Sequence, residues 1–185
     1  MATDAYYQPI TADQFLAMDF GTDRKFELSN GVIQMMTGGT ELHAWVQGNL
    51  VAWLRQALRG SGCRSYGSEM GVRVGEHDVR YPDVSIHCGK RPDHGENVRA
   101  LDRPVVIIEV LSPSTATFDQ GTKLEEYRSI DSVLQIVFVD PINQLIRTHR
   151  RLATGNWLIS DYAATGIELP MLGITIPQEE IFARD

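Results

Sequence analysis

The segment from 104 to 112, Pro-Val-Val-Ile-Ile-Glu-Val-Leu-Ser, constrains the fold of this chain more than any other. It is the most apolar stretch and is rich in β-branched residues, which predicts a central strand of a sheet. Glu109 interrupts it, and an unpaired carboxylate buried in such a strand costs several kcal/mol. Glu109 therefore needs a basic partner in a salt bridge, a metal ion, or a place at the strand end that faces solvent.

Asp83 offers a second carboxylate in the expected strand Tyr81–Ile86. A polar loop, 89–102, separates this strand from that of Glu109. If the two strands pair antiparallel about the loop midpoint near Glu96, Asp83 and Glu109 fall opposite each other, about 5 Å apart on one face. Two carboxylates at that separation repel, and a hard divalent cation removes the repulsion. We therefore predict that Asp83 and Glu109 bind Mg²⁺ or Mn²⁺.

The next expected helix, Asp119–Ile130, supplies a basic group. Asp119, Lys123 and Tyr127 recur at every fourth residue and so lie on one helix face. Lys123 can point back over the acidic pair, where it would orient a water or stabilise charge on an attacked phosphate. An Asp119–Lys123 pair in solvent is the alternative.

Two further residues are candidates for the site. Glu27 lies in a hairpin, 26–35, whose Asn-Gly turn supplies the positive φ values of a tight two-residue turn. Strand alternation places it on the face opposite its neighbours, either inward or outward. His43 lies near the start of the main amphipathic helix, 40–59, where a neutral ligand or a phosphate contact is possible. A surface or core histidine is the alternative.

The remaining pattern completes an α/β or mixed α+β chain that we expect to form one domain over residues 1–185. A helix begins after its N-cap Thr11. The other expected elements are strands at 63–68, 71–74, 79–88 and 132–139, a strand ending near Arg151, one or two strands in the tail, and a helix from Pro177.

Composition restricts the function classes. The net charge of −7 and pI near 5.2 argue against a protein that coats nucleic acid through a general positive field, but not against local contacts. No signal peptide or membrane-length apolar run is evident, so we expect a soluble, cytoplasmic protein without membrane association. In that compartment Cys63 and Cys88 are expected to be reduced, buried thiols. The sequence contains no nucleotide-binding motif, so we expect no organic cofactor.

These residues together carry a family resemblance. Glu27 in Phe-Glu-Leu-Ser-Asn-Gly, Asp83 in Pro-Asp-Val-Ser and Glu109 in Ile-Glu-Val-Leu-Ser-Pro-Ser-Thr, followed by Lys123 and its helix neighbours Asp119 and Tyr127, resemble the Uma-type restriction-endonuclease-like family. That family belongs to the PD-(D/E)XK nuclease superfamily. The resemblance extends from about residue 11 to 182.

The resemblance implies a restriction-endonuclease-like core, a central mixed β-sheet flanked by helices with an N-terminal hairpin. It implies a metal bound by Asp83 and Glu109. The superfamily pattern has lysine two positions after the glutamate, where this chain has Leu111, so the basic role passes to Lys123. Glu27 becomes an auxiliary catalytic acid.

The same resemblance implies that His43, Asp119 and Tyr127 line the site. The leading functional hypothesis is a magnesium-dependent endonuclease that hydrolyses DNA, acting as a homodimer. The alternatives are a non-catalytic nucleic-acid-binding or protein-interaction module, and a hydrolase of small phosphoesters.

Overall fold

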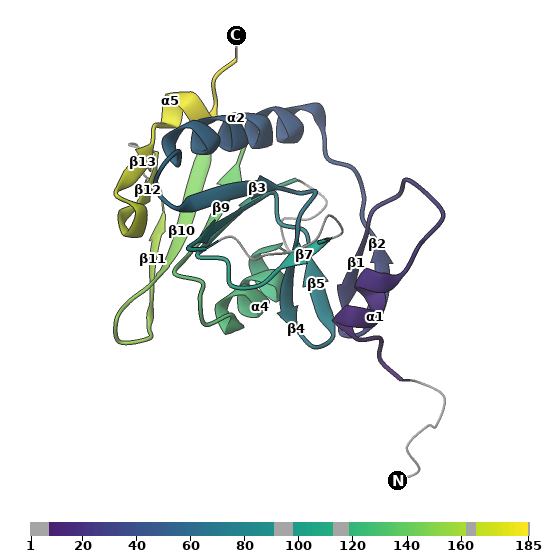
Figure 1. Ribbon diagram of the computed structural model, residues 1–185. Helices are drawn as coiled ribbons and strands as arrows, with labels where there is room; N and C mark the ends of the chain where they lie inside the picture. The colour runs from purple at the N-terminus through teal and green to yellow at the C-terminus, as the bar shows by residue number, and fades with distance from the viewer. Residues whose placement is uncertain (1–7, 91–97, 113–118, 162–165, 185) are drawn as a thin grey trace.

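A six-stranded mixed sheet forms the centre of the computed structural model, which describes residues 8–90, 98–112, 119–161 and 166–184 (Figure 1). Its strand order is β11-β10-β9-β8-β6-β3. Strands β8 and β9 are parallel and the other neighbours are antiparallel. The strands are β3 (Cys63–Gly67), β6 (Val84–Cys88), β8 (Val106–Val110), β9 (Gln135–Asp140), β10 (Leu145–Arg151) and β11 (Trp157–Asp161).

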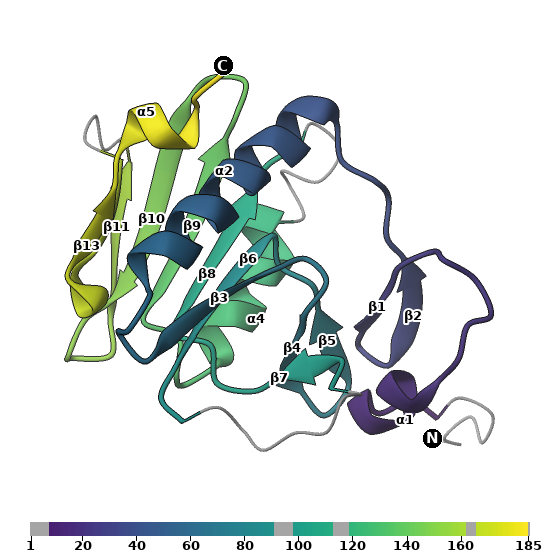
Figure 2. The ribbon, with the colours of Figure 1, turned by 45° about the horizontal axis from the view of Figure 1, so that its top comes forward.

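Helices cover both faces of this sheet (Figure 2). Alternate residues of β8 point to opposite faces. Ile108 packs in one core with Leu50 and Leu54 of α2 (Glu41–Ala57), while Ile107 packs in a second core with Leu124 of α4 (Leu124–Ser129). Burial on both faces explains why the β8 sequence is apolar almost without interruption.

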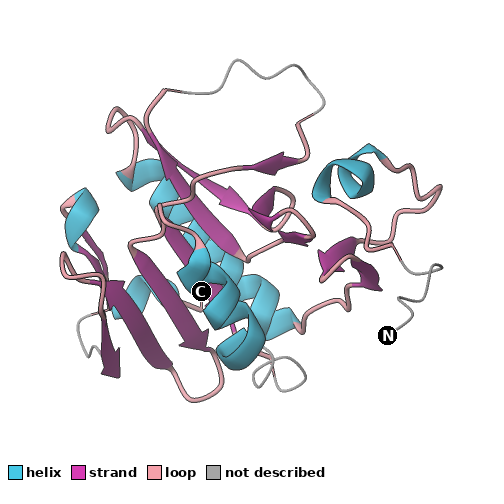
Figure 3. Ribbon diagram, turned by 90° about the horizontal axis from the view of Figure 1, so that it is seen from below, coloured by secondary structure: helices cyan, strands magenta, loops and turns pink. Residues whose placement is uncertain are grey.

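A second, five-stranded sheet has the order β2-β1-β5-β4-β7. Its strands are β1 (Phe26–Ser29), β2 (Val32–Met35), β4 (Gly71–Gly75), β5 (Asp78–Arg80) and β7 (Ala100–Leu101). Helix α1 (Ala12–Ala17) packs on it through Phe15, which contributes to a third core with Leu28 and Val79. Figure 3 shows α1 and the first hairpin together at one side of the molecule.

The C-terminal segment packs against the first core. It contains β12 (Ile167–Leu169), a 3₁₀ turn η2 (Pro170–Leu172), β13 (Ile174–Ile176) and α5 (Gln178–Ile181). With β11, the tail past residue 151 holds three strands among the described residues, where one or two were predicted. Within the parts of the chain that the structure describes, no helix is both long and apolar enough to cross a membrane.

Two local predictions are confirmed. Thr11 caps α1 in a capping box with Gln14, and Asn30 and Gly31 form the hairpin turn at φ 49° and 73°. Each of these motifs acts through its own backbone neighbours, which is why sequence alone identifies it.

The single strand predicted over 79–88 is wrong. The chain leaves β5 at Arg80 and begins β6 at Val84, and the two strands belong to different sheets. Pro82 lies in the break, where its missing N–H interrupts the hydrogen-bond ladder. Asp83 is consequently the residue just before β6 rather than mid-strand, at the point where the chain passes from the small sheet to the large one.

The prediction of two reduced, buried thiols is also wrong for this structure. Cys63 and Cys88 form a disulfide between β3 and β6, and Cys88 is exposed. The strand register pairs these two residues directly, so their side chains share one face. That register depends on the whole β3–β6 pairing, which the cysteine spacing does not encode.

Candidate active site

The two predicted acidic residues meet at the ends of two neighbouring strands. Val84 of β6 pairs with Ile108 of β8, and continuing the antiparallel register by one residue puts Asp83 opposite Glu109, as predicted. Asp83 Oδ2 accepts a 2.8 Å hydrogen bond from the backbone N–H of Val110. Both carboxylates are largely buried, so the strand ends hold them rigidly side by side.

Glu109 receives two hydrogen bonds from the helical segment that follows. Lys123 Nζ lies 3.2 Å from Glu109 Oε1, and Tyr127 Oη donates to the same oxygen at 2.6 Å. Burial, then the charge of Glu109 and this hydrogen bond, raise the pKa of Tyr127 well above its usual value. The phenol therefore stays protonated and acts as a donor to the carboxylate.

The helical segment that carries Lys123 begins with an irregular turn. Residues Asp119–Lys123 form a π-helical turn, η1, which continues directly into α4. Such turns insert an extra residue and change the direction of side chains, and they recur at functional sites. Here Lys123 is its last residue and points at Glu109. The side chain of Asp119, predicted to line the site, lies outside the described residues.

The first turns of α2 contribute to the other carboxylate. His43 Nε2 lies 3.1 Å from Asp83 Oδ2, and Gln47 Nε2 donates to the backbone carbonyl of Asp83 at 3.0 Å. A Cβ at Gly39 would lie 2.7 Å from His43 Nδ1. Glycine at this position therefore leaves the room that the imidazole occupies.

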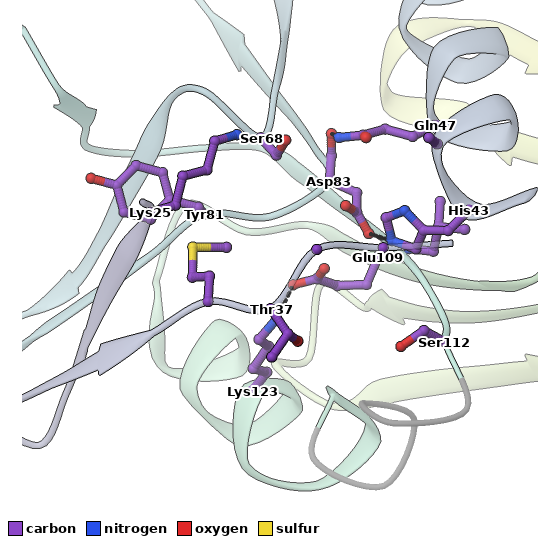
Figure 4. A pocket seen from close by; sticks show the side chains of 15 residues that line it. Lys25, Thr37, His43, Gln47, Ser68, Tyr81, Asp83, Glu109, Ser112 and Lys123 are labelled. Atoms are coloured by element: carbon purple, nitrogen blue, oxygen red, sulfur yellow. Dashed lines mark hydrogen bonds and ion pairs between the residues drawn. The ribbon is translucent and has the colours of Figure 1, made fainter. Parts of the chain in front are cut away.

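These side chains line a cavity of about 390 Å³. In Figure 4, Asp83 and His43 meet beside Glu109, and Lys123 approaches Glu109 from the helix on the other side. Polar groups from the small sheet and its connections complete the walls. The lining residues include Asp83, Glu109, Lys123, His43, Gln47, Lys25, Thr37, Ser68, Tyr81 and Ser112.

The donor set fits a magnesium or manganese ion that keeps several waters. Two carboxylates converge on one cavity large enough for water and a substrate oxygen, which is how Mg²⁺ is commonly bound. Among the described residues, no group of three or more His, Cys, Asp or Glu could enclose a metal. The chain would thus supply two carboxylate ligands, and water and substrate would supply the others.

Glu27, predicted as an auxiliary catalytic acid, pairs with the buried side chain of Arg80. Its Oε1 lies 2.9 Å from NH1 of Arg80, and it is not among the described residues that line the cavity. Arg80 is fully buried, and it also donates to both carboxylate oxygens of Glu126, at 2.6 and 2.7 Å, and to Ser29 Oγ at 2.8 Å. Burial disfavours this charge, but the Glu126 hydrogen bond and the two glutamate charges outweigh it and raise the pKa of Arg80.

Sequence reasoning did not identify Arg80. The signal was available in Val-Arg-Tyr-Pro, where a charged residue interrupts an apolar alternation next to Asp83. Arg80 is the last residue of β5, and the break between β5 and β6 leaves it between Glu27 of β1 and Glu126 of α4. Its ion pairs join β1, β5 and α4, the helix of Tyr127.

Comparison with known proteins agrees with the geometry. The sequence profile of Uma2, described as "Putative restriction endonuclease", matches residues 12–178. The chain belongs to the Uma2 family. This confirms the predicted resemblance, which was placed over nearly the same residues.

Relatives of this Uma2 chain match most of its length. One uncharacterized Synechocystis protein is 26% identical over 180 residues, covering 96% of this chain and 94% of its own. A second is 25% identical over 162 residues, covering 86% of this chain and 91% of its own. The crystal structure of a "putative nuclease belonging to DUF820" from Anabaena variabilis superposes with a TM-score of 0.74 at 20% identity, over 95% of this chain and 98% of that one. The mixed α/β fold is therefore shared, as predicted.

Proposed function

We propose that this Uma2 protein is a metal-dependent endonuclease that hydrolyses DNA phosphodiester bonds. The observation that carries the proposal is the convergence of Asp83, Glu109 and Lys123 on one cavity, with Lys123 Nζ 3.2 Å from Glu109. The two carboxylates suit a divalent cation. The adjacent ammonium suits the negative charge of a phosphate. The family description supports the same reaction class.

Asp83 and Glu109 would bind the metal in this proposal. When bound, a magnesium ion supplies a water of lowered pKa and positive charge against the phosphate. The Val110 N–H and His43 hold Oδ2 of Asp83, and Tyr127 holds Glu109. Both carboxylates are thereby oriented before substrate arrives, which lowers the cost of reaching the reactive geometry.

Lys123 would supply the positive charge that this site needs beyond the metal. Leu111, at the position where the superfamily pattern has lysine, is buried beside Tyr127 and Leu124 in the second core. Its side chain is apolar and is not among the described residues that line the cavity. Lys123 instead enters from the helix, where it can orient the attacking water or stabilise charge on the phosphate. Glu27 would act on the site only indirectly, through its ion pair with Arg80, which also binds Glu126 of α4.

Cleavage of supercoiled plasmid with Mg²⁺ or Mn²⁺ tests the proposal. We expect Asp83→Asn and Glu109→Gln each to reduce cleavage more than about a hundredfold, because each removes charge from the metal site. Glu125→Gln is the matched control, since Glu125 lies on α4 with an exposed side chain paired to Arg128. Circular dichroism would verify that each variant is folded. Wild-type protein that cleaves neither DNA nor RNA with either metal would refute nuclease activity.

Calorimetry separates the nuclease from a non-catalytic module. A nuclease of this design should bind Mn²⁺ with measurable heat, and the metal should raise its melting temperature. Both effects should disappear in Asp83→Asn. Metal binding with hydrolysis of small phosphoesters alone would favour the third class of function, and no metal binding at all would favour the non-catalytic module.

We also propose a homodimer, because cleavage of both DNA strands suits a two-fold pair of active sites. Light scattering of the purified protein measures this directly. A monomer at all working concentrations would refute the dimer, but it would not affect the proposed active site.

A further inference from the structure

A second cavity, of about 500 Å³, lies at the opposite end of α2 from the active site. Three arginines line it: Arg55 on α2, Arg59 just beyond α2, and Arg64 on β3. No Asp or Glu of the described residues is among the lining residues. We call this site the arginine pocket. The pocket is thus locally positive, although the chain as a whole has a net charge of −7.

The charges of the arginine pocket are not neutralised within the described parts of the chain. Arg55, Arg59 and Arg64 form no ion pair with any described residue. Arg64 donates from NH2 to the carbonyl of Gly89 at 3.0 Å, and its buried Nε has no hydrogen-bond partner. The guanidinium of Arg64 is therefore held in place beside the pocket by its hydrogen bond to Gly89.

A helix C-terminus by itself favours nearby cations, because the last carbonyls carry partial negative charge. That effect accounts for Arg55 and Arg59. It does not account for Arg64, which lies on the neighbouring strand. An anion shared by all three explains the convergence from two elements, since guanidinium groups bind phosphate oxygens through paired N–H donors.

The two cavities lie along one edge of the molecule. β3 is the edge strand of the six-stranded sheet and runs beside α2 (Figure 2). The active-site cavity includes His43 of α2 and Ser68, just past the end of β3. The arginine pocket includes Arg55 of α2 and Arg64 near the start of β3. A linear polyanion lying along α2 and β3 would therefore contact both.

The spacing suits a nucleic-acid duplex. From His43 to Arg55 is twelve helical residues, which at about 1.5 Å each is about 18 Å along the axis. From Arg64 to Ser68 is four strand residues, or about 13 Å. Half a turn of B-DNA is about 17 Å, the distance after which the opposite strand's backbone returns to the same side of the duplex.

We propose that the arginine pocket binds a backbone phosphate of the nucleic acid whose cleavage occurs in the other cavity. This inference rests on the proposed nuclease function and adds to it a second contact that positions the substrate. Because the contact is to phosphate, it would strengthen binding without selecting a base sequence.

Binding of a labelled DNA duplex of about two helical turns, measured by fluorescence anisotropy in EDTA over a range of KCl, tests the inference. EDTA prevents cleavage, so binding is measured separately from catalysis. We expect Arg55→Gln and Arg59→Gln each to weaken binding roughly fivefold, about the effect of one lost hydrogen bond. Each should also reduce the slope of log K against log [KCl] by about 1.

Arg150→Gln is the matched control. Arg150 lies on β10, which is separated from β3 by three strands of the same sheet. Its replacement removes the same charge as each pocket variant. It should leave the slope unchanged. Thermal unfolding would verify that all three variants remain folded; Arg55 and Arg59 are exposed, and Arg150 is half-buried.

The outcomes separate the possible failures. Wild-type affinity and slope in both pocket variants would overturn the inference, and plasmid cleavage by wild type would then leave the nuclease assignment standing. Arginine-dependent binding without cleavage would support the pocket and count against nuclease activity. If inorganic phosphate raises the melting temperature of wild type but not of the pocket variants, while duplex binding is equal in all, the pocket takes a free anion and the inference is overturned.

Discussion

Replacing Arg80 with methionine should destabilise the protein strongly, although Arg80 contacts neither the cavity nor solvent. Its side chain is fully buried between Glu27 and Glu126, whose own side chains are 11% and 16% exposed. Methionine preserves much of the apolar volume but leaves two buried carboxylates without their cation. Breaking a buried ion pair on one side typically costs about 3–5 kcal/mol.

That cost converts into a large thermal shift. For a chain of this size, 1 kcal/mol corresponds to about 2–4 °C in melting temperature, so we expect a decrease of about 6–20 °C. Calorimetry and urea denaturation measure the shift in melting temperature and the loss in free energy of unfolding.

Arg73→Met is the matched control for this experiment. Arg73 lies on β4 of the same sheet and pairs at 2.7 Å with Asp13, whose side chain is 85% exposed. A pair of that kind contributes about 0–1 kcal/mol. Adding Glu27→Gln and Glu126→Gln to Arg80→Met should recover part of the loss. If Arg80→Met and Arg73→Met had equally small effects, the view that the Arg80 ion pairs stabilise the packing of α4 on β1 and β5 would be refuted.

Three further predictions concern other groups. Lys123→Met should lower cleavage about 10²–10³-fold while Mn²⁺ still binds, as measured by plasmid cleavage and calorimetry. Burial, then the charges of Arg128 and Arg147, lower the pKa of His149 from 6.5 to about 4. Because the unfolded chain then binds the extra proton, the free energy of unfolding should fall as the pH drops from about 6.5 to about 4, and His149→Gln should flatten that part of the urea-denaturation profile. Reduction of the Cys63–Cys88 disulfide, which closes a 25-residue separation, should lower the free energy of unfolding by up to about 3.5 kcal/mol in denaturation with and without reductant.

The Asp83–Glu109 pairing was predictable because β6 and β8 are antiparallel neighbours whose register is symmetric about the middle of their connection. The observed register of β6 with β8 is the predicted one. Lys123 was predictable from its helical spacing to Tyr127, even though Lys123 is the last residue of a π-helical turn. In both cases the constraint is local: one loop, or one helix face.

What could not be predicted depends on how distant segments pair. The division of 79–88 between two sheets, the Cys63–Cys88 disulfide and the partners of Arg80 all follow from registers across segments far apart in sequence. Glu27 illustrates the consequence. Its alternation pattern allowed an inward acid, and the structure has it inward, but its partner is an arginine that becomes buried only when α4 packs on the small sheet.

The ion pairs of Arg80 also bear on how a lysine on a helix can replace one on a strand. A strand lysine is held by the sheet that holds the acidic residues, whereas Lys123 depends on the placement of its helical segment. That segment is fixed from two directions, since Glu126 is bound by Arg80 of β5 and Tyr127 is bound to Glu109 of β8. A small displacement of a catalytic group is costly to the reaction. We therefore propose that the ion pairs of Arg80 with Glu27 and Glu126 hold the helical segment of Lys123 in place, so that Arg80 and Glu27 would support the site without lining it.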